Sequence, residues 1–149
     1  MRTYVDSGIL AKLYIPEAGT EETILRLREI QQIPLLLLHE LEIRNALRAQ
    51  AGRDLIRHEQ LVSALAAFQE DIGAGRLAGT SVDWPHIFAR AEDLSREHAS
   101  KILCRALDIL HVAAAEAAGC AAFITGDGRQ ADLALSVGLE VTRIGQRTR

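Results

Sequence analysis

The chain has 149 residues, of which 48% are hydrophobic and 25% are charged, and its formal net charge is −3. This length and composition fit one domain, residues 1–149, with a single sizeable core, and they argue against a disordered chain. A mildly acidic chain has no general affinity for nucleic acid. Such a partner would have to be bound locally, near Arg or Lys side chains.

The sequence shows no sign of export or of membrane insertion. The N-terminus MRTYVDSG lacks the apolar run of a signal peptide, and no stretch of about 18 apolar residues occurs anywhere. Cys104 and Cys120 show neither a CxxC nor a Cys/His spacing. We therefore expect a reduced, cytoplasmic protein that does not enter a membrane.

In the first half, a short strand candidate precedes helical patterns. The expected elements, in chain order, are a strand at 3–6, helices at 7–14 and 20–29, a strand at 34–38, a helix from 39 to about Gly52, and a helix at 54–72.

The second half continues the alternation. The expected elements are a weak strand at 77–82, a helix at 85–98, a helix at 106–118, a strand at 121–125, a helix at 129–137 and a strand at 139–144. Residues 102–107 also look helical. Apolar strands that alternate with helices predict a three-layer α/β/α fold with a central parallel sheet of four to five strands.

Acidic residues gather where the predicted strands end. Asp6 closes the first strand, Asp127 follows the strand at 121–125, and Asp108 lies in the helix that precedes that strand. The strand at 34–38 leads directly into Glu40 and Glu42. Because the carboxyl ends of parallel strands share one edge of a sheet, these side chains should meet there.

Each acid also has a simpler explanation. Asp6 fits a helix N-cap, and Asp127 fits a turn residue between glycines. Glu40 and Glu42 could simply lie in the first turn of a helix, where the helix dipole stabilises negative charge. A cap explains Asp108 less well if 102–107 is helical. Four acids at one edge would repel one another by several kcal/mol, at about 4 kcal/mol per close pair. A divalent cation removes that penalty, and oxygen ligands favour Mg²⁺ or Mn²⁺.

The two glutamates are separated by helix geometry. Successive helical residues turn by about 100°, so Glu40 and Glu42 cannot both point into one site. Glu42 shares its face with Asn45 and the small Ala46, which leaves room for a cleft, and we therefore choose Glu42.

Four stretches resemble the motif blocks of the PIN-domain ribonucleases, and most of all the VapC-type toxins of VapBC toxin–antitoxin modules. They are YVDSGILAKLYIPEAG, ELEIRNALR, RALDILHVAAA and FITGDGRQADLA, and together they span residues 4–134. Two positions depart from the family pattern, Gly8 and Gly126.

The resemblance implies a single PIN domain over 1–149, with Asp6, Glu42, Asp108 and Asp127 as the catalytic acids. It also implies RNA as substrate, Mg²⁺ or Mn²⁺ as cofactor, a homodimer, and a cognate antitoxin as inhibiting partner.

The expected reaction is metal-dependent hydrolysis of an RNA phosphodiester. Asp6, Asp108 and Asp127 would hold the metal, and Glu42 would orient water or complete a second metal's shell. The residues assigned supporting roles are Thr125, Asn45 and Arg129. The main alternative is a catalytically weak or silent PIN-like module that acts by binding a partner.

Overall fold

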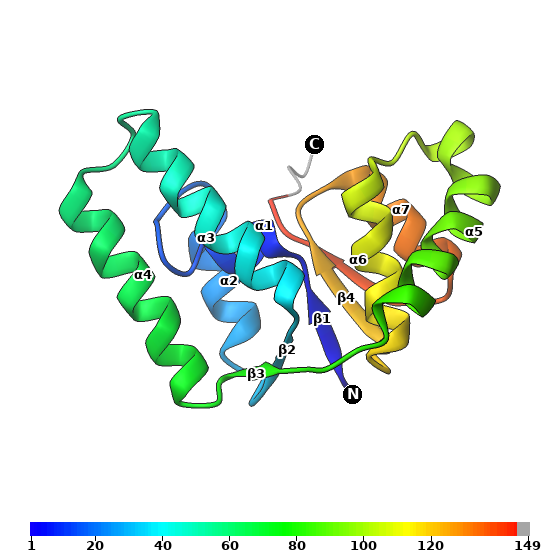
Figure 1. Ribbon diagram of the computed structural model, residues 1–149, viewed down its shortest axis with the longest axis horizontal. Coiled ribbons are helices and arrows are strands. Elements are labelled where there is room, and N and C mark those ends of the chain that lie inside the picture. Colours follow the sequence, from blue (N-terminus) through cyan, green and yellow to red (C-terminus); the bar gives the residue numbers. More distant parts are fainter. Residues whose placement is uncertain (146–149) are drawn as a thin grey trace.

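The computed structural model describes residues 1–145, in which strands and helices alternate (Figure 1). The strands are β1 (Thr3–Val5), β2 (Ile33–Leu35), β3 (Leu77–Gly79), β4 (Ala122–Thr125) and β5 (Glu140–Arg143). The helices are α1 (Ser7–Ala11), α2 (Thr20–Leu27), α3 (Leu37–Gly52), α4 (His58–Gly73), α5 (Trp84–Ile102), α6 (Ala106–Ala117) and α7 (Gly128–Ser136).

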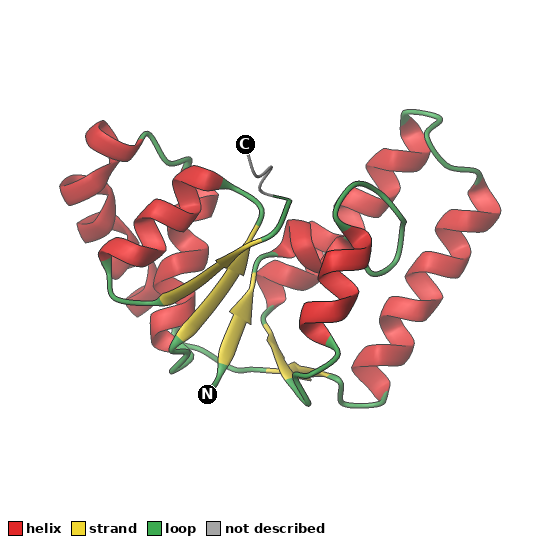
Figure 2. Ribbon diagram, turned by 180° about the vertical axis from the view of Figure 1, so that it is seen from behind, coloured by secondary structure: helices red, strands yellow, loops and turns green. Residues whose placement is uncertain are grey.

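Every strand pair is parallel. β4 lies between β1 and β5, whereas β2 pairs with β3 and packs next to β1 (Figure 2). The predicted α/β fold with a parallel sheet is confirmed. The strands nevertheless form two hydrogen-bonded groups, one of three strands and one of two.

His39 connects these two groups of strands. Its Nδ1 accepts a hydrogen bond from the backbone N–H of Leu36 at 3.0 Å, and its Nε2 donates to the carbonyl of Val5 at 2.9 Å. Burial lowers the pKa of His39 to about 3, so the ring is neutral and holds one tautomer. The first turn of α3, which leads to Glu42, is thereby fastened to the end of β1.

The sheet separates two apolar cores. Tyr4 and Phe123 face the helices α5, α6 and α7, and their rings stack at 5.3 Å. Val5 and Ile124, the next residues along, face the helices α1 to α4. Because successive strand residues point to opposite faces, two short apolar strands supply both cores and fix the central layer.

Two predicted boundaries are wrong in ways that matter for function. Residues 102–107 are not continuously helical: α5 ends at Ile102, and Leu103 adopts a left-handed conformation with φ 60°. Asp108 therefore lies in the first turn of α6, where the helix dipole favours a carboxylate. The predicted strand 34–38 ends at Leu35, because the backbone turns at Leu36 into α3.

In the part of the chain that the structure describes, no helix has both the length and the apolar character needed to cross a membrane.

Candidate active site

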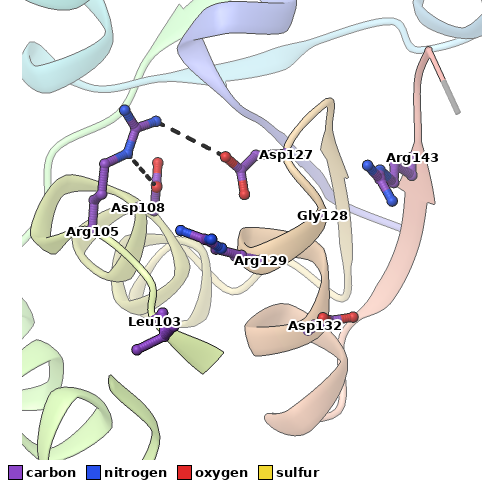
Figure 3. A pocket seen from close by; sticks show the side chains of 8 residues that line it. All are labelled: Leu103, Arg105, Asp108, Asp127, Gly128, Arg129, Asp132 and Arg143. Atoms are coloured by element: carbon purple, nitrogen blue, oxygen red, sulfur yellow. Dashed lines mark hydrogen bonds and ion pairs between the residues drawn. The ribbon is translucent and has the colours of Figure 1, made fainter. Parts of the chain in front are cut away.

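The four predicted acids come from four different elements at the carboxyl end of the sheet. Asp6 directly follows β1 and Asp127 follows β4, while Asp108 and Glu42 lie near the starts of α6 and α3. Asp108 and Asp127 line a pocket of about 560 Å³, shown in Figure 3. The strand ends thus deliver the acids to a common region, as parallel topology requires.

Asp6 and Asp127 are both helix N-caps. The Oδ2 atom of Asp6 accepts from the backbone N–H of Gly8 at 3.2 Å, and the Oδ1 atom of Asp127 accepts from that of Gln130 at 2.9 Å. Each cap uses one carboxylate oxygen. The other oxygens face the site, with Asp6 Oδ1 accepting from Gln130 and Asp127 Oδ2 lying near Arg105. Capping and site formation therefore occur together.

Asp108 and Asp127 are bridged by Arg105. The Nε atom of Arg105 lies 3.3 Å from Asp108 Oδ2, and its Nη2 atom lies 3.9 Å from Asp127 Oδ2 (Figure 3). Burial raises the pKa of Asp108, and the charges of Asp127 and Asp6 raise it further, while Arg105 opposes them. The Arg105 side chain is 81% exposed, so it supplies positive charge without being packed in place.

Glu42 is held by side chains that are almost fully buried. The imidazole Nε2 of His111 donates to Glu42 Oε1, the hydroxyl of Ser7 donates to the same oxygen at 3.1 Å, and Tyr4 donates to His111 Nδ1 at 2.7 Å. Burial opposes ionisation of Glu42, but the bonds from His111 and Ser7 outweigh it and lower its pKa. His111 Nε2 also lies 3.9 Å from Asp6 Oδ1, which places Glu42 and Asp6 around one imidazole.

The donor set has the chemistry of a magnesium or manganese site. Asp6, Asp108 and Asp127 offer only carboxylate oxygens, and the guanidinium of Arg105 already occupies the space between two of them as a cation. As arranged over residues 1–145, no group of three His, Cys, Asp or Glu side chains has the geometry to hold a metal ion. A cation bound between Asp108 and Asp127 would compete with the Arg105 guanidinium for those two carboxylates.

The three supporting residues have different surroundings. Thr125 is fully buried, and its hydroxyl bonds to Gln130 and to the backbone of Asp127 instead of to a carboxylate. Asn45 is exposed on α3. Arg129 lines the pocket and points toward Asp108 and Asp127 (Figure 3).

Glu40, the acid set aside in favour of Glu42, forms an ion pair with Arg44 at 3.2 Å on the surface of α3.

Sequence reasoning missed Arg105 and Gln130 as site residues and left His111 outside the catalytic set. The spacing of Arg105 three positions before Asp108 is a detectable signal once α6 is known to begin at Ala106. Gln130 gives no such signal, since its partner Asp6 lies 124 positions away.

The fold is shared with proteins of known structure. A chain in the crystal structure of VapBC2 from Rickettsia felis bound to a DNA fragment from their promoter matches with a TM-score of 0.65 and 16% identity, over 97% of this chain and 99% of that one. A chain of FitAcB from Neisseria gonorrhoeae matches with a TM-score of 0.63 and 15% identity, over 95% and 96%. No family model and no curated protein matches this chain.

Proposed function

We propose that this chain is a metal-dependent ribonuclease and the toxin of a toxin–antitoxin pair. The observation that carries the proposal is the bridge from the exposed Arg105 to Asp108 and Asp127, with Asp6 near enough to affect the pKa of Asp108. Carboxylates kept close by a loosely packed cation suit a site that exchanges that cation for a metal. The fold it shares with VapBC2 and FitAcB chains supports the same assignment.

Asp6, Asp108 and Asp127 would hold Mg²⁺ or Mn²⁺. Such a metal supplies positive charge for the scissile phosphate and makes water a better nucleophile. Glu42, kept ionised by His111 and Ser7, can accept a proton from attacking water at Oε2, the oxygen that neither partner occupies. The base role is assigned to Glu42 on geometry: its Oε2 is free of hydrogen bonds from His111 and Ser7, whereas Asp6, Asp108 and Asp127 would be engaged by the metal.

The RNA backbone would lie along the pocket beside Asp108 and Asp127. Arg129 and Arg143 also line this pocket, and both are exposed. Neither makes an ion pair with any acid among residues 1–145, so their charges stay available to phosphate. The pocket lining as a whole carries three arginines and three aspartates, so phosphate contacts would depend locally on these two arginines.

The direct test is RNA cleavage by the purified chain, freed of any bound partner, with Mg²⁺ or Mn²⁺. We expect activity that disappears with a chelator and in Asp6→Asn and Asp108→Asn. Glu40→Gln is the matched control, because Glu40 lies on α3 near Glu42 but is paired with Arg44. Intact activity in both Asn variants would overturn the metal site. Failure of the wild-type chain to bind Mn²⁺ in calorimetry would favour the silent binding module.

An antitoxin would dock against α4, away from the pocket that Asp108 and Asp127 line. From the sequence alone, the expected position is between the helices at 20–29 and 54–72. The structure has a groove of about 490 Å³ beside α4, but its other wall is the segment Leu13–Pro16 and not α2, so the expected pair of helices does not form it. Its mixed apolar lining suits an amphipathic helix. A pull-down with the product of the adjacent gene tests this: Ala67→Glu on α4 should abolish binding and leave RNA cleavage intact. The homodimer remains a prediction.

A further inference from the structure

Gln130 is a fully buried polar side chain at the centre of the acid cluster. It lies on α7, three residues after the N-cap Asp127. Its Nε2 donates to Asp6 Oδ1 at 3.2 Å and to the backbone carbonyl of Asp108 at 3.3 Å, and its Oε1 accepts from Thr125. A buried amide with all these partners satisfied is held in one position.

The direction of the amide follows from its neighbours. The hydroxyl of Thr125 accepts from the backbone N–H of Asp127 at 3.0 Å, so its own hydrogen is free to donate to Gln130 Oε1 at 2.5 Å. The Nε2 group then faces Asp6 Oδ1 and the Asp108 carbonyl, which are both acceptors. A flipped amide would set Oε1 against those two acceptors and leave them without a donor.

Gln130 therefore connects all three elements that carry the proposed metal ligands. Asp6 follows β1, Asp108 begins α6, and Asp127 caps the helix that contains Gln130 and receives its backbone N–H. Gln130 bonds to all three of these residues, through its side chain to Asp6 and Asp108 and through its backbone N–H to Asp127.

A neutral amide also suits this place for electrostatic reasons. A Lys or Arg at position 130 could donate to the same acceptors, but its positive charge would neutralise the carboxylate of Asp6. Arg105, an exposed side chain, already does this for Asp108 and Asp127. A glutamine orients the carboxylate of Asp6 while leaving its negative charge available to a cation. Arg105 can leave, being exposed, whereas Gln130 cannot.

We propose that Gln130 is the positioning residue of this site: its side chain ties the Asp6 carboxylate to the backbone of Asp108, its backbone N–H holds the Asp127 carboxylate, and divalent-cation affinity depends on the arrangement that results. This inference rests on the proposed metal-dependent function. It adds a residue that touches neither substrate nor metal but determines how tightly the metal is held.

The test is Mn²⁺ binding to the metal-free full chain by calorimetry, with no RNA present. Gln130→Met fills the same space without the side-chain hydrogen bonds to Asp6, Asp108 and Thr125, while the backbone bond to Asp127 stays, and we expect its affinity for Mn²⁺ to fall by about 10- to 100-fold. Gln69→Met is the control, because Gln69 lies on α4, a helix that carries none of the four acids, and over residues 1–145 its side chain accepts a bond only from Arg44 on the neighbouring α3. Its affinity should equal that of wild type.

Thermal unfolding without metal is measured in parallel. If Gln130→Met is unfolded at 25 °C, Gln130→Asn replaces it, because this variant keeps the amide on a shorter side chain. Its affinity for Mn²⁺ should also fall by at least about tenfold. Wild-type affinity in a folded Gln130 variant would overturn the inference and leave the proposed function standing. Absence of Mn²⁺ binding by the wild-type chain would overturn both.

Discussion

Glu42 on α3 and His111 on α6 are hydrogen-bonded although 69 positions separate them in the chain. Tyr4 completes the arrangement from β1, because its hydroxyl donates to Nδ1 and so leaves Nε2 as the protonated nitrogen that faces Glu42. His111 is almost fully buried, and its hydrogen bond fixes the position of the Glu42 carboxylate. The orientation of Glu42 thus depends on a residue in the first strand.

Replacing Tyr4 with Phe should disturb Glu42 without changing the shape of the core. The buried Nδ1 of His111 loses its donor, and the free energy of unfolding should fall by about 1–3 kcal/mol. RNA cleavage should fall several-fold. Tyr14→Phe is the control: it removes the bond from the Tyr14 hydroxyl to Asp71, outside the site, and costs stability alone. Urea unfolding and cleavage rates, measured together, separate the two effects. Equal cleavage by both variants would contradict the role of Tyr4.

The stability of the protein should fall in acid because of His39. Its pKa is lowered to about 3 in the folded chain by burial, whereas the unfolded chain takes up the proton near pH 6.5. The unfolded state therefore binds more protons between these values, and folding loses about 1.4 kcal/mol per pH unit below about 6. His39→Gln removes this contribution. Urea unfolding at pH 7, 6 and 5 measures the free energy of unfolding of both proteins. The difference between wild type and His39→Gln should become smaller as the pH falls. A difference that does not change with pH would contradict the role of His39.

Asp108→Asn should inactivate the protein without unfolding it. Because burial and the neighbouring charges of Asp127 and Asp6 raise the pKa of Asp108, its ionised form weakens the fold at pH 7. That cost is present above the raised pKa and disappears below about pH 3.8, where the group is protonated in both states. The metal-free variant should thus be as stable as wild type or more so in thermal unfolding at pH 7. A loss of several kcal/mol would show that Asp108 mainly supports α6.

Arg105→Ala should strengthen metal binding. The variant removes the guanidinium that a cation must displace from Asp108 and Asp127, and Mn²⁺ affinity in calorimetry should rise several-fold. Arg96→Ala is closely matched, because Arg96 forms an exposed ion pair with Asp93 at the same three-residue spacing. It should leave the affinity unchanged. A lower affinity in Arg105→Ala would mean that Arg105 organises the site instead of competing for it.

Arg129→Ala and Arg143→Ala should weaken RNA binding in a salt-dependent manner. Removing one cation that binds a phosphate of a single strand lowers the slope of log affinity against log salt by about 0.7. The measurement uses fluorescent single-stranded RNA in an Asp108→Asn background, which prevents cleavage. Arg53→Ala, at the far end of α3, should keep the full slope. Unchanged slopes in the two pocket variants would place the RNA elsewhere.

The acids that follow strands could be predicted from the sequence because strand ends are visible as changes from apolar to polar residues. Asp6 and Asp127 are of this kind, and both lie where expected. The break at Leu103 could not be predicted, since a left-handed leucine has no compositional signal comparable to that of glycine. Without this break, the sequence does not predict that α6 begins at Ala106 or that Arg105 lies close to Asp108.

The remaining features depend on contacts between distant segments. The bond from His39 to the end of β1, which links the two groups of strands, is one of them, and nothing local to His39 predicts that contact. The hydrogen bonds of Gln130 are likewise tertiary. Periodicity reports which face of an element is apolar, but it does not report which buried polar side chain will meet which acceptor.

The double use of Asp6 and Asp127 as helix caps has an evolutionary consequence. Alanine at either position removes a carboxylate and also uncaps a helix, at a cost of about 0.5–2 kcal/mol in stability. Asparagine removes the charge but still caps, and one nucleotide transition converts an aspartate codon into an asparagine codon. Selection against the proposed nuclease activity would therefore favour asparagine at these two positions, because the descendants would lose the charge and remain folded.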